Sequence, residues 1–221
     1  YMDWEDFQHQ VVDPSSGDCI VPAEEPSCQP SGKLPWISIV GNVGDAHSIG
    51  ITMSFDWVPA VCWVVGANAQ WIEAEIDNVN TDDQTTITTG RQLPHTPEFQ
   101  GSAWATYTWP VSFVPNGEIF LRGQYSYTGE THTLLNPAGL DTVNPDFTND
   151  AYSLLDLRLG LISGKWQLDF FINNVTDERA QITQGSTSYE WQWGRSGEYD
   201  HWHKVYTVRP REYGLRFFTH F

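Results

Sequence analysis

Apolar and polar side chains alternate one by one along seven segments of the chain, which is the side-chain period of a β-strand. One face of each segment is largely apolar and carries no charge. Taking every second residue, the apolar faces run over Ile51–Trp57, Trp63–Trp71, Phe99–Trp109, Ile119–Tyr127, Ser153–Leu161, Trp166–Ile172 and Tyr213–Phe221. The positions between them include Asp56, Glu118, Arg122, Asp156, Arg158, Asp169 and Arg216. Weaker alternation over residues 1–12 predicts one more strand, so we expect an all-β chain of about eight antiparallel strands.

The connections between these segments alternate strictly between short and long. Short turns are predicted near 58–62, 110–117 and 162–165, and long loops near 13–35, 77–97, 129–150 and 176–206. In an antiparallel meander this rhythm places every short turn at one end. Four tryptophans, Trp57, Trp63, Trp109 and Trp166, flank the short turns, as an aromatic girdle at one membrane interface requires. The pattern predicts an antiparallel transmembrane β-barrel segment of meandering strands with short periplasmic turns and long extracellular loops.

The composition and motifs of the chain argue against two classes of function, nucleic-acid binding and catalysis. A formal net charge of −17 over 221 residues argues against nucleic-acid binding, because phosphates would be repelled. The sequence contains no phosphate-binding loop, nucleophile elbow or zinc-ligand spacing, so an enzyme is not expected. Neither an initiating methionine nor a signal peptide precedes the strand-like sequence at Tyr1, and we therefore expect a fragment whose missing part lies upstream.

Four short motifs stand in a fixed order along the strands: Asn42–Gly50, Leu93–Pro97, Asn174–Arg179 and Arg209–Gly214. Together with the terminal aromatic strand, they resemble the C-terminal β-barrel portion of a TonB-dependent outer-membrane receptor, over residues 1–221. Asn174 and Asp177 are expected to bond neighbouring backbone where a strand leaves the barrel.

The resemblance implies a function for the parent protein. Such receptors take up a scarce nutrient across the bacterial outer membrane, most often a ferric siderophore and sometimes cobalamin or a glycan. The implied partners are outer-membrane lipid, the barrel-assembly machinery, a small-molecule ligand, and the TonB complex through a plug domain. The chain shows neither that plug domain nor the earlier strands. Its last strand, with Tyr213, Leu215, Phe217 and Phe221, resembles the C-terminal assembly signal of the family.

The long segment 181–206 holds the candidate ligand-contacting aromatics Trp191, Trp193 and Trp202, which are suited to stacking on an aryl or sugar ligand. His201 and His203, with Glu198 and Asp200 nearby, have metal-capable side chains. Two histidines spaced i, i+2 do not supply a third or fourth ligand, so no metal site is expected, and the resemblance implies no cofactor.

Cysteines and inward charges also have simple interpretations. Cys19 and Cys28 are predicted to form a disulfide in an oxidising compartment, whereas Cys62 is expected at a strand start as a small apolar side chain. Asp156 and Arg158 share a face two residues apart, and we expect them to pair.

Two other architectures fit the alternation. One is a stand-alone eight-stranded outer-membrane barrel with a structural or adhesive role, which a signal peptide just before Tyr1 would indicate. The other is a secreted, soluble β-sandwich that binds carbohydrate through exposed tryptophans, and it would remain monodisperse without detergent.

Overall fold

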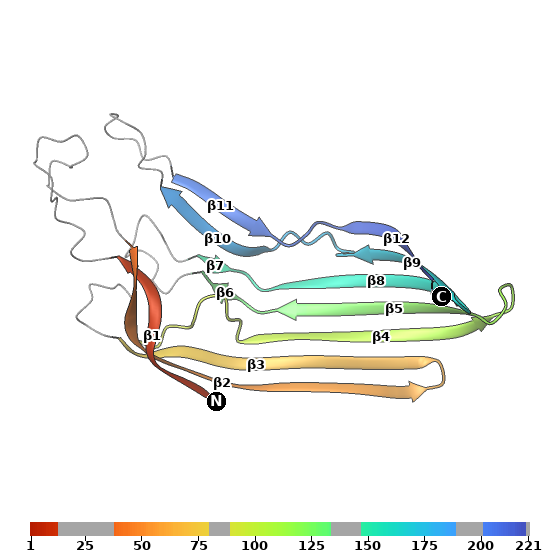
Figure 1. Cartoon of the computed structure of the whole chain (residues 1–221), viewed down its shortest axis with the longest axis horizontal. Coiled ribbons are helices and arrows are strands. Elements are labelled where there is room, and N and C mark those ends of the chain that lie inside the picture. The colour runs from red at the N-terminus through yellow and green to blue at the C-terminus, as the bar shows by residue number, and fades with distance from the viewer. Residues whose placement is uncertain (13–37, 80–88, 134–146, 189–200, 220–221) are drawn as a thin grey trace, which may run out of the picture.

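The computed structural model of the chain describes residues 1–12, 38–79, 89–133, 147–188 and 201–219. Eight strands form one antiparallel sheet in which spatial order follows chain order (Figure 1). The strands are β1 (Met2–Val12), β2 (Ser38–Ala60), β3 (Trp63–Val79), β4 (Phe99–Val111), β5 (Gly117–Thr128), β8 (Tyr152–Ser163), β9 (Trp166–Asn173) and β12 (Glu212–Thr219). The predicted all-β meander of about eight strands is therefore confirmed.

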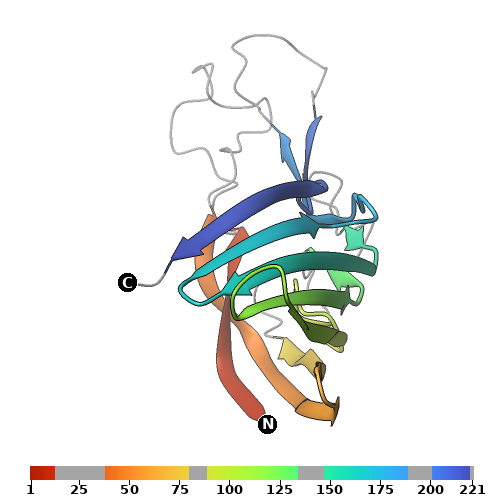
Figure 2. The same ribbon diagram turned by 90° about the vertical axis from the view of Figure 1, so that its right-hand side faces the viewer.

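The sheet curves across its strands and remains open. Figure 2 views the strands more nearly end-on and shows the sheet bent into a trough. β1 and β12 are its two edge strands, and the described residues contain no pairing between them. An open antiparallel sheet presents unpaired N–H and C=O groups along both edges, which a membrane does not tolerate. The structure thus shows a section of wall rather than a closed eight-stranded cylinder.

The short connections lie together at one end of this wall, as the alternating rhythm predicted. They comprise residues 61–62, 112–116 and 164–165. Two further pairs of short strands lie toward the opposite end (Figure 1): β6 (Thr131–His132) with β7 (Thr148–Asn149), and β10 (Gln181–Ser188) with β11 (His201–Thr207). Cys62 is not the first residue of a strand as expected, because it forms the β2–β3 turn with φ of 77°.

Three segments predicted as loops contain strand pairing. In 129–150, β6 pairs with β7. Residues 176–206 are not one loop, because β10 and β11 form an antiparallel ladder that joins Gln184 to Val205 and Thr187 to Trp202. In 77–97, β3 continues to Val79, and the returning chain bonds to it through Ile76 N–H to Arg91 C=O at 3.0 Å. The β10–β11 ladder carries no apolar-in, polar-out alternation, so the strand pattern used for the wall did not reveal it. β3 does alternate beyond Trp71, with Ile72, Ala74 and Ile76 on one face and Glu73, Glu75 and Asp77 on the other.

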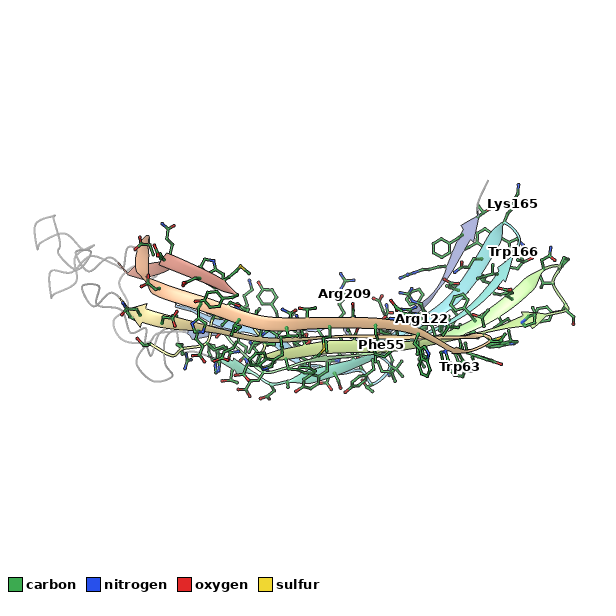
Figure 3. The ribbon with its side chains drawn as sticks, turned by 90° about the horizontal axis from the view of Figure 1, so that it is seen from below. Phe55, Trp63, Arg122, Lys165, Trp166 and Arg209 are labelled. Atoms are coloured by element: carbon green, nitrogen blue, oxygen red, sulfur yellow. The ribbon has the colours of Figure 1, made fainter. Side chains whose placement is uncertain are left out.

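The described part of the chain has almost no conventional apolar core. Its buried apolar residues are Ala46, Ala74, Ile76 and Val208. Large apolar side chains instead cover the outer face, where Phe55 and Trp57 are 57% and 60% exposed. Figure 3 labels Phe55 and Trp63 of this apolar face and Arg122 of the polar inner face. Within the described ranges, no helix has the length and apolarity to cross a bilayer. The apolar face must be covered by something other than the described part of the chain.

Candidate functional site: the inner wall

Aromatic side chains form two belts on the outer face. Toward the short turns, Trp63 contacts Tyr107 with ring centroids 4.9 Å apart, and Tyr107 stacks on Trp109 at 5.4 Å. Toward the other end, Phe99 lies 5.9 Å from Tyr127. From Phe99 to Trp109 the strand rises about 33 Å, which corresponds to about 25 Å along the barrel axis at a tilt near 40°. This height matches the apolar band of an outer-membrane barrel.

The inner face follows a different rule, in which aromatic rings cover glycines of the neighbouring strand. The pairs Trp104 with Gly66, Phe120 with Gly160, and Phe171 with Gly214 are each directly opposite in register. A Cβ at Gly66 would lie 2.6 Å from the Trp104 ring, and one at Gly214 would lie 2.9 Å from the Phe171 ring. Each ring therefore occupies the space that its partner's side chain would need.

Arginines lie over two of these rings. The guanidinium carbon of Arg122 is 4.3 Å from the Trp104 ring centroid, and that of Arg216 is 4.4 Å from the Phe171 centroid. Stacking on a ring uses the face of the guanidinium plane and leaves its edge N–H donors free to bond elsewhere. The wall thus carries two layered units of glycine, ring and guanidinium.

A depression of about 300 Å³ lies beside the first unit on the inner face. It is lined by Phe120, Arg122, Gln124, Asp156, Arg158, Gln167 and Asp169. The side chain of Asp169 is buried and accepts hydrogen bonds from Gln167 Nε2 at 2.8 and 3.0 Å. Asp156 accepts the backbone N–H of Asn174 at 2.8 Å. The expected pairing of Asp156 with Arg158 is wrong, because that carboxylate turns toward the backbone at the end of β9.

The inner wall over β3 and β4 is polar but uncharged. Asn68 Nδ2 donates to Ser102 Oγ at 3.0 Å, and Gln100 Nε2 donates to Gln70 Oε1 at 2.9 Å. These bonds join cross-strand neighbours, so they satisfy the amides without an outside partner. The inner faces of β5, β8, β9 and β12 carry charges of both signs, with Arg122, Arg158 and Arg216 beside Asp156 and Asp169. A charged patch therefore adjoins a neutral patch on β3 and β4.

Asn174 joins the end of β9 to the start of β12. Its side chain, in a residue only 4% exposed, donates to the carbonyls of Glu178 and Arg209, both at 2.9 Å, and accepts the Glu178 N–H at 2.8 Å. Its φ of 52° lies in the left-handed region, which asparagine tolerates better than most residues. The expected bonding of Asn174 to neighbouring backbone is confirmed.

Asp177 closes the same junction from the outside. Its Oδ1 accepts the Arg211 N–H at 2.9 Å, and its Oδ2 accepts from Arg179 Nη2 at 3.1 Å. The Arg211 N–H first, and the Arg179 guanidinium second, lower the pKa of the Asp177 carboxyl below its ordinary value. The hairpin β10–β11 lies in the chain between Asp177 and β12. The hydrogen bonds of Asn174 and Asp177 to the segment before β12 therefore hold the two ends of the hairpin together.

Several predicted site residues lie beyond what the structure describes. Trp191, Trp193, Glu198, Asp200, Cys19, Cys28 and Phe221 are outside the described residues. Trp202, His201 and His203 have their backbones in β11, opposite Thr187, Ser188 and Ser186. Tyr213, Leu215 and Phe217 lie on the outer face of β12 and are exposed. Over the described ranges, no three His, Cys, Asp or Glu side chains gather as metal ligands.

Sequence reasoning missed the glycine–ring–guanidinium units. The inward glycines and aromatics are all visible in the alternation, but pairing them needs the register between strands. That register follows from the turns, and the alternation predicts the lengths of those turns only approximately.

A curved antiparallel wall with an apolar, belted outer face and a polar inner face defines a section of a transmembrane β-barrel. The family model described as "TonB dependent receptor-like, beta-barrel" matches residues 1–175. The chain therefore belongs to the TonB-dependent receptor family, whose members are non-enzymatic transporters of the bacterial outer membrane. This membership excludes the secreted β-sandwich.

Solved structures show the same fold. The ferric yersiniabactin uptake receptor FyuA of Yersinia pestis aligns with a TM-score of 0.61 and 15% identity over 82% of this chain and 24% of its own. The siderophore receptor PiuA of Acinetobacter baumannii gives 0.56 and 15% identity over 82% of this chain and 23% of its own. The chain thus spans about a quarter of the length of these receptors. No curated protein sequence matches it.

Proposed function

We propose that the chain is the C-terminal part of the barrel wall of a receptor that takes up a ferric siderophore with energy from the TonB complex. The single observation that carries the proposal is the open wall itself. It has two unpaired edges, and it matches about a quarter of two receptors, one named a ferric yersiniabactin uptake receptor and the other a siderophore receptor. The remaining strands and a plug domain would come from other parts of the same polypeptide.

Uptake by cells tests the proposal. A strain that lacks its own siderophore receptors is supplied with the full receptor and given ⁵⁵Fe bound to a panel of siderophores. We expect TonB-dependent accumulation of iron with at least one of them. Accumulation of cobalamin or of a glycan instead would support a TonB-dependent receptor and contradict siderophore uptake.

The loop aromatics remain proposed ligand contacts. Trp202 lies on β11 of the hairpin β10–β11. Hydrogen bonds from Asn174 and Asp177 hold the base of this hairpin to the wall. In the full receptor, Trp191→Ala, Trp193→Ala and Trp202→Ala should each weaken ligand binding several-fold, because stacking contributes roughly 1 kcal/mol per ring. Trp57→Ala, at the opposite end of the wall, is the matched control. Unchanged affinity in all three loop variants would remove them from the site.

The last strand is proposed as the signal for barrel assembly. Tyr213, Leu215 and Phe217 lie together on the outer face of β12, with Phe221 two strand periods beyond Phe217 in sequence. Deleting Phe221 from the full receptor should lower the amount that reaches the outer membrane. Unchanged surface levels, measured by labelling intact cells, would count against this role.

A further inference from the structure

The ladder of β6 and β7 is too short to be stable by itself. Each strand has two residues, and an isolated two-stranded ladder is marginal in water even when it is longer. Nevertheless, the polar residues Thr131, Thr133 and Asn149 of this region are buried. Buried polar side chains are retained where hydrogen bonds satisfy them. The β6–β7 ladder is therefore held in place by its neighbours.

One neighbour is the segment 89–98, which leads into β4. The His95 N–H donates to the His132 carbonyl oxygen at 2.8 Å. Just before β6, the Gly129 N–H donates to the Phe99 carbonyl oxygen at 2.8 Å. Both bonds use backbone groups, so β6 is joined to the chain that enters β4 whatever side chains lie there.

The other neighbour is β10, which lies beside β7 (Figure 1). Gln184 Nε2 on β10 donates to the Thr148 carbonyl oxygen and to Asn149 Oδ1, both at 3.2 Å. Asn149 Nδ2 in turn donates to Thr131 Oγ1 on β6 at 3.2 Å. The Asn149 amide thus accepts from β10 and donates to β6, and it completes a chain of bonds from β10 to the segment 89–98.

A depression of about 240 Å³ lies where the three segments meet. Its lining includes His95 and Pro97 from the first segment, Asn149 from β7, and Gln181 and Ile182 from β10. Because each segment supplies part of the lining, displacement of any one of them alters the shape of the depression.

We infer that the segment 89–98, the β6–β7 ladder and the β10–β11 hairpin form one mechanical unit at the extracellular end of the wall. Gln184 is the positioning residue that couples the hairpin to the other two. A displacement of the hairpin, on which Trp202 lies, is transmitted through Asn149 to His95. This coupling goes beyond the proposed uptake, which does not require these segments to move together.

Hydrogen exchange at the His95 amide tests the coupling at the far end of the chain of bonds. In Gln184→Glu, a carboxylate without a donor faces the two acceptor oxygens that the amide had bonded. The full receptor without ligand is studied in lipid nanodiscs, and exchange at single amides is measured by mass spectrometry. We expect the His95 amide to exchange about fivefold faster than in the unchanged receptor. The intrinsic exchange rate of that amide is unaffected, because residue 184 is far away in sequence.

Gln181→Glu is the matched control. It makes the same change on the same strand and beside the same depression, but the side chain of Gln181 has no hydrogen bond within the described residues. His95 should exchange at its original rate in this variant. Equal effects of the two substitutions, or no effect of Gln184→Glu on His95, would overturn the inference.

A double variant distinguishes coupling from separate structural damage. Gln184→Ala and Asn149→Ala break the same chain of bonds, so their combination should speed exchange at His95 no more than Asn149→Ala alone. Additive effects would mean independent routes and would contradict the coupling. Gln184→Ala also replaces Gln184→Glu should the latter not assemble, and heat-modifiable mobility on gels verifies the folded barrel. Because no ligand is present, these outcomes are independent of whether the receptor takes up a siderophore.

Discussion

The ring of Phe120 fills the space that a side chain at Gly160 would need. The two residues are directly opposite in the β5–β8 ladder, and a Cβ at Gly160 would overlap ring atoms Cε1 and Cζ while lying 2.6 Å from Asp169 Oδ1. Asp169 is not free to move far, since it is bonded to Gln167. The inner wall is therefore closely packed at a point where the sequence shows only a glycine.

Gly160→Ala should destabilise the barrel by about 1–3 kcal/mol, because one added methyl forces the Phe120 ring from its place. Urea unfolding of the full receptor in lipid vesicles measures the change. Gly123→Ala is the matched control on the outer face of β5, where a Cβ would meet only Leu157 Cδ2 at an ordinary 3.5 Å. Equal midpoints for the two variants would contradict the packing described.

Asn174→Ala should cost about 2–4 kcal/mol, because it leaves the carbonyls of Arg209 and Glu178 and the Glu178 N–H without their partner. Asn173→Ala, one residue earlier, removes a single exposed bond to Glu212 and should change stability by less than about 1 kcal/mol. The same urea titration compares them. Asn174→Gly keeps the left-handed backbone, so a comparable loss in that variant assigns the effect to the hydrogen bonds.

Protonation of Asp177 should loosen the base of the β10–β11 hairpin. Its pKa is lowered in the folded protein, so the stabilisation is present above the ordinary Asp range and is lost as the pH falls through the lowered folded value, below about pH 4. Hydrogen exchange at the Arg211 amide, expressed relative to Asp177→Asn at each pH, should show protection that declines over this window. Asparagine keeps an acceptor oxygen and does not titrate. A ratio that stays constant down to pH 2 would refute the role of the carboxylate.

Ala67→Arg should cost about 2–4 kcal/mol, because Ala67 lies on the outer face midway between Trp63 and Trp71, near the centre of the apolar band. Asn68→Arg places the same charge at nearly the same depth on the inner face and should be nearly neutral. Unfolding in vesicles compares the pair. A similar cost on both faces would mean that the outer face does not meet lipid.

The strands of the wall were predictable because lipid and lumen impose opposite demands on alternate residues. Leu157, Leu159 and Leu161 face outward without exception, and Asp156 and Arg158 face inward between them. The hairpin β10–β11 escaped prediction because Thr183, Gln184 and Tyr206 lie beyond the wall, where no such alternation is imposed. Asn174 and Asp177 bond across the base of this hairpin. Their bonding to backbone could be expected from their residue types, but their partners at Arg209 and Arg211 could not.

The partners within the inner wall were unpredictable for a related reason. Trp104, Phe120 and Phe171 are visibly inward, yet which glycine each covers depends on a register set by Cys62 in a two-residue turn and by the short turns that follow. Likewise, Asp156 turned to Asn174 rather than to Arg158, because a backbone N–H leaving the ladder at the end of β9 had no strand partner.

Each inward ring and the glycine that it covers can be substituted only together. A larger residue in place of Gly66, Gly160 or Gly214 is tolerated only if Trp104, Phe120 or Phe171 shrinks with it. Among related receptors, the two members of each pair should therefore change together across a strand boundary, although Gly66 and Trp104 are far apart in sequence. Such paired changes would reveal the strand register of a relative for which only the sequence is known.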